Sequence, residues 1–144
     1  MGMYTELVLA IELKPEPPPE VLRILQMLVG SRARDGFGRF AQERLFPNHP
    51  FFSCGHWRLV LQGSSAYFPG QESRNLLYEP EWQLWTLTSR SSLKNYDKEI
   101  EKFWNWLSPF VETEGFCGYY RYEEDREPTL LYHMACKTYR REGQ

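Results

Sequence analysis

One segment of the sequence, residues 95–111, constrains the fold more than any other. Its large apolar side chains recur at spacings of three and four, which places them on one face of a helix. That apolar face consists of Tyr96, Ile100, Phe103, Trp104, Leu107 and Val111. The other face carries Asp97, Lys98, Glu101 and Asn105. Since a helix so apolar on one side needs a second layer to cover it, the sequence predicts a helix packed on a sheet.

Alternating apolar and polar residues predict strands on both sides of this helix. The expected strands are residues 4–14, 56–62, 66–68, 82–88, 116–122 and 129–139, with a few more strand residues at 76–78. The first strand is semi-apolar on its second face as well, so it is expected in the middle of the sheet. A second helix is predicted over residues 20–29, between the proline-rich connector 15–19 and Gly30. A short helix is expected at residues 40–46.

The order of these elements predicts an α+β fold, with a single, mostly antiparallel β-sheet and two α-helices on one face. It contains the β-α-β-β-α-β order called ferredoxin-like, with extra strands added. With 144 residues, 42% of them hydrophobic and 25% charged, the chain suits one domain spanning residues 1–144. Folds of this class host many functions, so function has to be argued from particular residues.

Charge and cysteine content narrow the class of protein. The formal net charge is −2, whereas a domain that grips nucleic-acid phosphates is usually basic. The three cysteines form an odd and scattered set, which fits a reducing cytoplasm better than secretion. The first residues do not resemble a signal peptide, and no apolar run is long enough to cross a membrane. A cytoplasmic protein without a membrane partner is therefore expected.

One short region gathers residue types that bind metal ions. His49, Cys54 and His56 lie within eight residues, and imidazole and thiolate ligands suit zinc. A fourth ligand and a recognised ligand spacing are missing, so no metal and no cofactor are predicted. The sequence places no base beside any cysteine, and no catalytic residue is assigned. A small hydrolase or metal enzyme that uses residues 32–56 is kept as a third hypothesis.

The segment 31–39 is basic and rich in glycine. Arginine side chains beside accessible backbone amides can bind an anion or a partner, so Arg32, Arg34 and Arg39 are predicted contact residues. The segment lacks the Gly-Lys-Ser/Thr of a P-loop. A mobile surface loop fits this composition better than a phosphate site.

Residues 115–122 read Gly-Phe-Cys-Gly-Tyr-Tyr-Arg-Tyr and resemble the RNP1 strand of RNA recognition motifs, whose aromatic rings stack on bases. The resemblance implies binding of single-stranded nucleic acid or a nucleotide on an aromatic sheet face, which is the second hypothesis. Glu114 stands where that motif has a basic residue. The segment also follows the second long helix, whereas RNP1 precedes it.

The last two strands are predicted to form a hairpin across the acidic turn that precedes Thr129. Pairing Tyr122 with Thr129 places Tyr120 and Tyr122 on one face together with Phe116, and Tyr119 on the other. Three neighbouring tyrosines cannot all lie on one buried face. At least one of them is therefore expected to face outward, and all three are predicted contact residues for a partner or ligand.

The leading hypothesis rests on the aromatic content, which is 16% of the chain. This is more than two helices and a short sheet need for a core, and Tyr and Trp are favoured at interfaces. We therefore expect a small non-catalytic binding protein that acts through protein–protein contact, an accessory or inhibitor protein of bacterial or phage type. Its expected partner is a protein, with a homodimer left open and nucleic acid disfavoured.

Overall fold

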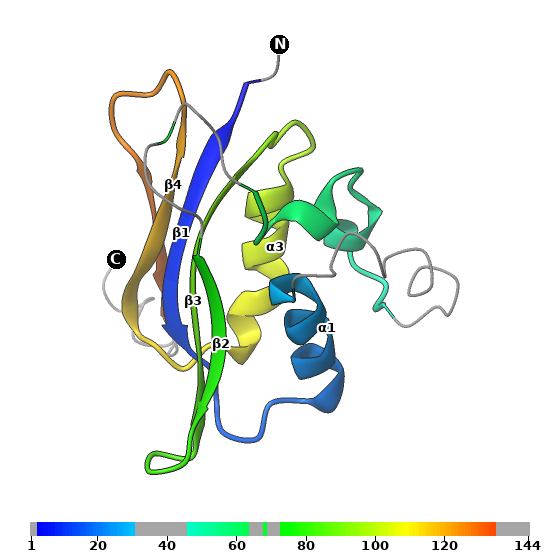
Figure 1. Ribbon diagram of the computed structural model, residues 1–144, viewed down its shortest axis with the longest axis vertical. Helices are drawn as coiled ribbons and strands as arrows, with labels where there is room; N and C mark the ends of the chain where they lie inside the picture. The colour runs from blue at the N-terminus through cyan, green and yellow to red at the C-terminus, as the bar shows by residue number, and fades with distance from the viewer. Residues whose placement is uncertain (1–2, 31–45, 64–67, 69–72, 135–144) are drawn as a thin grey trace.

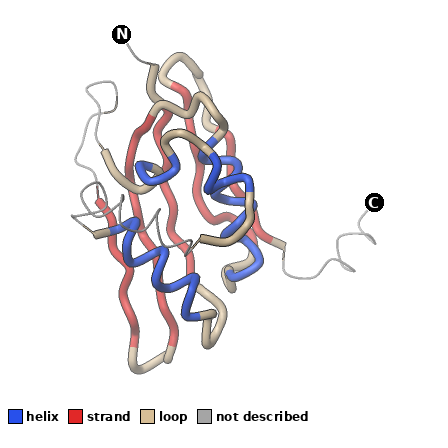
Figure 2. Tube along the Cα trace, turned by 90° about the vertical axis from the view of Figure 1, so that its right-hand side faces the viewer, coloured by secondary structure: helices blue, strands red, loops and turns tan. Residues whose placement is uncertain are grey.

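The computed structural model describes residues 3–30, 46–63, 68 and 73–134. Within this part, five strands form one antiparallel sheet, and two α-helices lie on one of its faces (Figures 1 and 2). The α+β fold predicted from the sequence is confirmed. The elements in chain order are β1 (Thr5–Glu12), α1 (Pro19–Val29), η1 (Pro50–Ser53), η2 (Trp57–Leu59), β2 (Ser73–Glu79), β3 (Leu84–Leu93), α3 (Glu99–Leu107), η3 (Ser108–Phe110), β4 (Gly115–Tyr122) and β5 (Thr129–His133), where η denotes a 3-10 helix.

The strands lie in the order β2-β3-β1-β4-β5, and every neighbouring pair is antiparallel. β1 is in the middle, as its two-sided apolar pattern predicted. β5 is added outside β4 at one edge. The strand order therefore differs from that of a ferredoxin-like sheet, and this part of the prediction is not confirmed.

The core fills the space between the sheet and the helices. On β1, Leu7, Leu9 and Ile11 point toward the helices and are almost completely buried. Leu7 lies opposite Ser91 of β3 and Tyr120 of β4, so both neighbouring strands contribute to the same inner face. The alternation seen in the sequence thus distinguishes the inner face of β1 from its outer face.

Helix α1 follows the prediction closely. It begins at Pro19, whose fixed φ suits the first helical position, and it ends before Gly30. Its buried side chains recur at helical spacing and are Val21, Ile24, Leu25 and Leu28. These side chains cover the half of the sheet that includes β2.

Helix α3 is shorter than predicted and buries a different tryptophan. The Asn95 side chain accepts a hydrogen bond from the backbone N–H of Ile100 at 2.8 Å, and Lys98 takes a left-handed conformation, so regular helix begins only at Glu99. Trp106 is buried, whereas Trp104 is only half-buried and Tyr96 is exposed before the helix starts. The predicted inward position of Tyr96 is therefore wrong, whereas Trp104 packs against the core with part of its ring only.

The strand predicted over residues 56–62 is also wrong, because this segment contains the 3-10 helix η2. Trp57, Val60 and Leu61 are all buried, and their spacing of three and four suits a helical turn. Together with η1, the segment adds an aromatic cluster to the flank of α3. In it, Phe51 and Phe52 lie with ring centroids 6.2 and 5.3 Å from that of Trp106. This contact explains why Trp106 is buried.

Strand β3 starts later than predicted and runs further. The turn before it includes Gln83, whose φ is 55° and whose backbone N–H donates to the carbonyl of Glu79 at 2.7 Å. Residues 89–93, expected to lead into the helix, continue the strand. Ser91 faces inward and donates a hydrogen bond to the carbonyl of Val60 at 2.8 Å, so a small side chain here makes room for the η2 segment.

Candidate functional site

A β-bulge in β4 determines which aromatic rings reach the surface. Gly118 lies opposite Leu131 and Phe116 lies opposite Tyr132, so the register shifts by one residue at Cys117. Because side chains alternate along β5, this shift sends Phe116 to the face opposite that of Gly118. The prediction that Phe116 shares a face with Tyr120 and Tyr122 is therefore wrong.

The predicted pairing of Tyr122 with Thr129 is also wrong, since Thr129 lies opposite Tyr120. The turn between the strands is longer than a tight hairpin and includes four acidic residues, Glu123, Glu124, Asp125 and Glu127. Gly118 explains how β4 approaches β1 so closely at the bulge, because a Cβ at this position would collide with the carbonyl oxygen of Val8. Only glycine fits this position without moving a strand.

The three predicted contact tyrosines divide between the two faces of the sheet. Tyr120 and Tyr122 lie opposite Leu7 and Thr5 and therefore face the helices, whereas Tyr119 lies opposite Val8 and faces away from them. All three are half-buried. Burial, and after it the negative charge of Glu101 on α3, raises the pKa of Tyr120, which agrees with its inward position.

The outer face carries a group of exposed apolar side chains where β4 meets β5. Phe116, Leu130 and Tyr132 are 55%, 45% and 56% exposed, and Tyr119 lies directly opposite Leu130. We call Phe116, Tyr119, Leu130 and Tyr132 the outer patch. Neither α1 nor α3 lies over this face of the sheet (Figures 1 and 2). The alternation of Leu130 and Tyr132 in the sequence indicated two apolar side chains on one face of β5. The predicted pairing of Tyr122 with Thr129 did not place Phe116 beside them.

In a second part of the outer face, ion pairs with two arginines cover the carboxylate of Glu6. Glu6 is only 3% exposed, and its carboxylate contacts the guanidinium of Arg90 at 2.8 Å and that of Arg121 at 3.8 Å. The ring of Phe68 lies over the Arg121 guanidinium, with 4.9 Å to the ring centroid. The two arginines therefore compensate a buried carboxylate and are not simply free to bind an anion.

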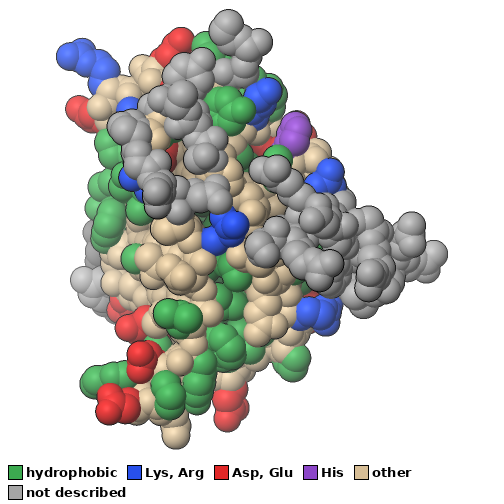
Figure 3. All heavy atoms as spheres, viewed as in Figure 1, with side chains coloured by type: hydrophobic (Ala, Val, Ile, Leu, Met, Phe, Trp, Pro, Cys, Tyr) green, Lys and Arg blue, Asp and Glu red, His purple; other side chains and the backbone are tan. Residues whose placement is uncertain are grey.

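A further exposed apolar group lies at the turn between β2 and β3. Trp82 is 73% exposed, and Leu77 and Tyr78 are also exposed. Trp82 was expected inside a strand, whereas it lies in the turn that ends at Gln83. The hairpin extends from the lower end of the molecule (Figure 1), where hydrophobic side chains lie beside acidic ones (Figure 3). The adjacent Glu-Pro-Glu sequence was the available turn signal.

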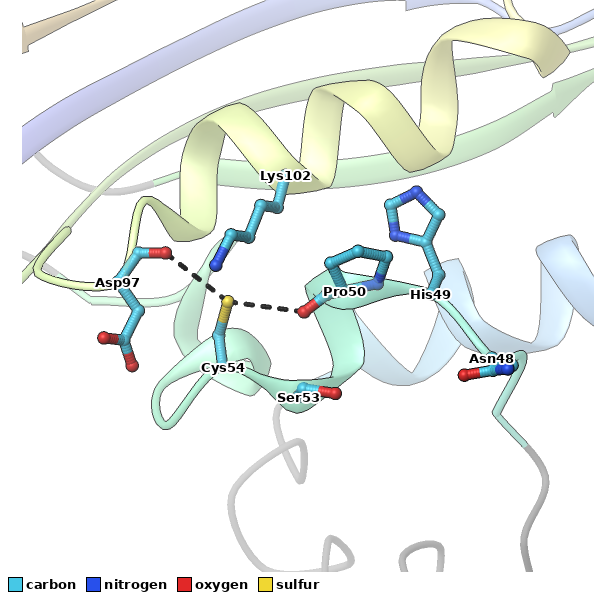
Figure 4. A pocket seen from close by; sticks show the side chains of 7 residues that line it. All are labelled: Asn48, His49, Pro50, Ser53, Cys54, Asp97 and Lys102. Atoms are coloured by element: carbon cyan, nitrogen blue, oxygen red, sulfur yellow. Dashed lines mark hydrogen bonds between the residues drawn. The ribbon is translucent and has the colours of Figure 1, made fainter.

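The predicted metal-binding residues are only partly brought together. An open hollow of about 530 Å³ is lined by Asn48, His49, Pro50, Ser53, Cys54, Asp97 and Lys102 (Figure 4). His49 uses its Nδ1 atom to accept a hydrogen bond from the backbone N–H of Phe51 at 3.1 Å. His56 is outside the hollow, with its Nδ1 atom 3.7 Å from Glu99. Among the described residues, no group of three or more His, Cys, Asp or Glu side chains could hold a metal ion.

Cys54 is the thiol that lines this hollow, and its surroundings favour the protonated form. Its thiol lies 3.6 Å from the carbonyl oxygens of both Pro50 and Asp97. Burial raises the pKa of Cys54, and the positive charge of Lys102, which extends toward the sulfur in Figure 4, only partly offsets this rise. A nucleophilic cysteine needs the opposite shift.

Glu99 is a buried carboxylate that sequence reasoning missed. Its Oε2 atom accepts a hydrogen bond from the backbone N–H of His56 at 3.2 Å, and its Oε1 atom accepts one from that of Asp97 at 3.1 Å. The residue is fully buried at the start of α3. It therefore ties the η2 segment to the helix, which is a structural role.

The remaining predicted contact residues lie outside the described part of the chain, namely Arg32, Arg34 and Arg39. The same holds for residues 40–45 of the helix expected at 40–46 and for residues 66 and 67 of the strand expected at 66–68. No described helix is long and apolar enough to cross a membrane. Comparison of the chain with protein-family models, curated proteins and solved structures gives no match. Function is therefore inferred from the described surface alone.

Proposed function

We propose that this chain is a small non-catalytic binding protein that acts by contact with another protein, as an inhibitor or accessory factor. The outer patch is the surface on which the partner docks. The observation that carries the proposal is the pair of exposed rings, Phe116 and Tyr132, on the face of the sheet that α1 and α3 leave open. A cytoplasmic location belongs to the same proposal and rests on the odd number of cysteines.

The chemistry of the outer patch suits a protein partner. Two tyrosine rings, Tyr119 and Tyr132, offer apolar area and a hydroxyl group each, while Phe116 and Leu130 offer apolar area alone. Rigid aromatic side chains lose little conformational entropy on binding and recur among the residues that dominate binding energy. The patch also lies on paired strands, which hold its side chains in place before a partner arrives.

Single-stranded nucleic acid is the second candidate, and bases could stack on Phe116 and Tyr132. Two observations weigh against it. Of the four rings in the RNP1-like segment 115–122, Tyr120 and Tyr122 face the helices, so the segment does not present its rings on one open face. On the outer face, the nearby charge of Arg121 is shared with the buried carboxylate of Glu6. A hydrolase that uses Cys54 as its nucleophile is disfavoured as well, because burial raises the pKa of this thiol.

Affinity purification from the native host tests the proposal, with the wild-type chain and two variants of it used as baits. Tyr132→Ser removes a ring of the outer patch, and Tyr96→Ser is a matched control at a comparably exposed position near α3. One protein should co-purify with the wild type and with Tyr96→Ser but not with Tyr132→Ser. Calorimetry with that purified protein should then reproduce the order. Identical sets of captured proteins from all three baits would overturn the proposal, and capture of RNA through Tyr132 would favour the second candidate.

A further inference from the structure

The outer face of the sheet carries short side chains at its centre. Ala10 of β1 and Thr88 of β3 face away from the helices and lie directly opposite each other. Asn75 of β2 lies opposite Thr88, so the row of short side chains extends to the edge strand. All three residues are exposed and uncharged, and neither α1 nor α3 lies over this face (Figures 1 and 2). The centre of the outer face is therefore open to another molecule.

Larger apolar side chains flank this row on both sides. Phe116 and Tyr132 of the outer patch lie on the side of β4 and β5, and Leu77, which is 59% exposed, lies on β2. Leu77 shares the outer face because it lies opposite Thr86, two residues from Thr88. Neighbouring strands are about 4.8 Å apart, so β4 and β2, which are three spacings apart, are separated by about 14 Å. An α-helix with its side chains has a diameter of about 10–12 Å and fits between the two flanks.

The end of the outer face next to the β2–β3 turn is acidic. Glu12 and Glu79 are exposed and face outward, because each lies two residues beyond an outward-facing residue of its strand. Glu81 is exposed in the adjacent turn, and exposed Glu112 is held beside Glu12 by a hydrogen bond from its backbone N–H to the Glu12 carbonyl at 2.7 Å. Exposed Lys14 offsets one of these four negative charges. A partner that covers this end therefore needs positive charge there.

A helix suits the shape of this face better than a second sheet. In a β-sandwich, the facing sheets interdigitate large apolar side chains, whereas short side chains occupy the centre here. A helix can contact these short side chains with its apolar stripe and contact the larger side chains on both flanks at the same time. From Val8 to Lys14, β1 rises about 20 Å at about 3.3 Å per residue, which equals about 13 residues of helix.

We propose that the partner presents an amphipathic α-helix, which lies along β1 and β3 on the outer face. The apolar stripe of this helix contacts Ala10 and Thr88, with the outer patch on one side and Leu77 on the other. Lysine or arginine side chains at one end of the helix lie beside Glu12 and Glu79. This inference rests on the proposed function, because it specifies the kind of partner that the outer patch binds.

Synthetic peptides test the kind of partner. The probe is a labelled peptide of about 18 residues, the Leu/Lys peptide, with leucine at helical spacing and lysine between. Fluorescence anisotropy with the purified full chain should show saturable binding of this peptide. A peptide of the same composition in scrambled order, and one with glutamate in place of lysine, should each bind at least about tenfold more weakly. Equal affinity for the three peptides, or binding of none, would overturn the helix inference. The proposed function would still stand if a Tyr132-dependent protein partner is captured from the host.

Ala10→Phe tests the position of the helix. The added ring would occupy the centre of the outer face, so the Leu/Lys peptide should bind about tenfold more weakly, whereas a ligand of the outer patch alone would bind as before. Ala10 is exposed and aromatic residues suit strands, so the variant should fold. Leu77→Ser should also weaken binding, and Tyr96→Ser, at a comparably exposed position near α3, should not.

Unchanged or tighter binding of the Leu/Lys peptide by Ala10→Phe and Leu77→Ser would overturn the proposed position. Sedimentation equilibrium of the chain alone addresses a different occupant. A dimer that Ala10→Phe dissociates would assign the outer face to a second copy of the chain and would overturn the inference, whereas a monomer is the expected result.

A charge reversal tests the acidic end. Glu12→Lys with Glu79→Lys should reverse the preference, so that the glutamate peptide binds more tightly than the Leu/Lys peptide. Glu124→Lys with Glu127→Lys makes the same change in net charge in the turn after β4, beside the start of β1, and should leave the preference unchanged. All four glutamates are exposed, so both double variants should fold. The same preference in the two double variants would overturn the proposed charge complementarity.

Discussion

The ring of Phe116 packs edge-on against the ring of Tyr132, with 6.0 Å between their centroids, on the face of the sheet opposite α1 and α3. The two residues are brought together by the bulge at Cys117, without which Phe116 would turn toward the helices. Both side chains remain more than half exposed. The pair therefore contributes little to the core and is available for contact with another molecule.

Replacing Phe116 by alanine should separate folding from binding. Phe116→Ala should change the free energy of unfolding by less than about 1 kcal/mol, because the ring is largely hydrated in the folded state. The same change should weaken partner binding by about 2 kcal/mol or more, as expected of a central interface ring. Urea denaturation and calorimetry with the purified partner measure the two quantities.

Phe103→Ala is the control for this measurement, since Phe103 is a ring of the same kind that is only 1% exposed. It should lower the free energy of unfolding by about 3–5 kcal/mol. Equal losses of stability from Phe116→Ala and Phe103→Ala would mean that Phe116 belongs to the core and not to the outer patch.

The two glycines of β4 should respond differently to substitution by alanine. Gly118→Ala places a Cβ against the carbonyl of Val8, so β1 and β4 have to separate, and the loss of stability should exceed about 2 kcal/mol. Gly115 has a φ of 91°, but a Cβ at this position would meet no heavy atom within 4 Å, so Gly115→Ala should cost only about 1–2 kcal/mol of backbone strain. Thermal and urea unfolding of both variants measure the two losses of stability. A larger loss from Gly115→Ala than from Gly118→Ala would contradict the close approach of β4 to β1 at Gly118.

The periodicity of apolar residues predicted a helix or strand well where the element packs against the core with a single regular apolar stripe. β1 and α1 each pack one regular apolar stripe into the core, and both lie within two residues of their predicted bounds. The segment 56–62 was mistaken for a strand because Trp57, Leu59 and Leu61 alternate, while Trp57, Val60 and Leu61 fit a helical turn equally well. The aromatic cluster around Phe51, formed by residues distant in sequence, decides between these two patterns.

The candidate surface was predicted only in part, because its composition depends on strand register. At least one of the three tyrosines of β4 was expected to face outward, and Tyr119 does, but Phe116 was wrongly placed on the face of Tyr120 and Tyr122. A single unpaired residue, Cys117, reverses every face assignment on its N-terminal side. Nothing in the local sequence distinguishes a bulge at Cys117 from a regular strand that contains Gly118, since the close contact between Gly118 and Val8 is made across the sheet.

The tryptophans of α3 offer a direct test of the observed helix face. Trp106→Ala should lower the free energy of unfolding by about 3–5 kcal/mol, because the ring is buried beside Phe51 and Phe52. Trp104 is half-buried at the margin of the core, so Trp104→Ala should cost clearly less. Urea denaturation of both variants measures the difference. A larger loss of stability from Trp104→Ala than from Trp106→Ala would indicate that α3 packs on the core with the face predicted from the sequence.

The reactivity of Cys54 tests whether the hollow beside α3 is a catalytic site. Its pKa lies above the ordinary value, chiefly because of burial, so at pH 8.5 folded Cys54 should react with iodoacetamide more slowly than it does in the unfolded chain. Lys102 lowers this pKa and Asp97 raises it, so Lys102→Gln should slow the reaction further and Asp97→Asn should speed it. Peptide mass spectrometry follows Cys54 separately from the other cysteines.

The same shift predicts how Cys54 affects stability with pH. A thiol whose pKa is raised by folding favours the folded state while it stays protonated, and this contribution is lost as the pH rises through the folded pKa. Above the ordinary thiol pKa, the free energy of unfolding of the wild type should therefore fall with pH more steeply than that of Cys54→Ser. Near neutrality, the free energies of unfolding of the two proteins should change with pH in the same way. Faster alkylation of folded Cys54 than of the unfolded chain would show an activated thiolate, and it would revive the hydrolase hypothesis for residues 32–56.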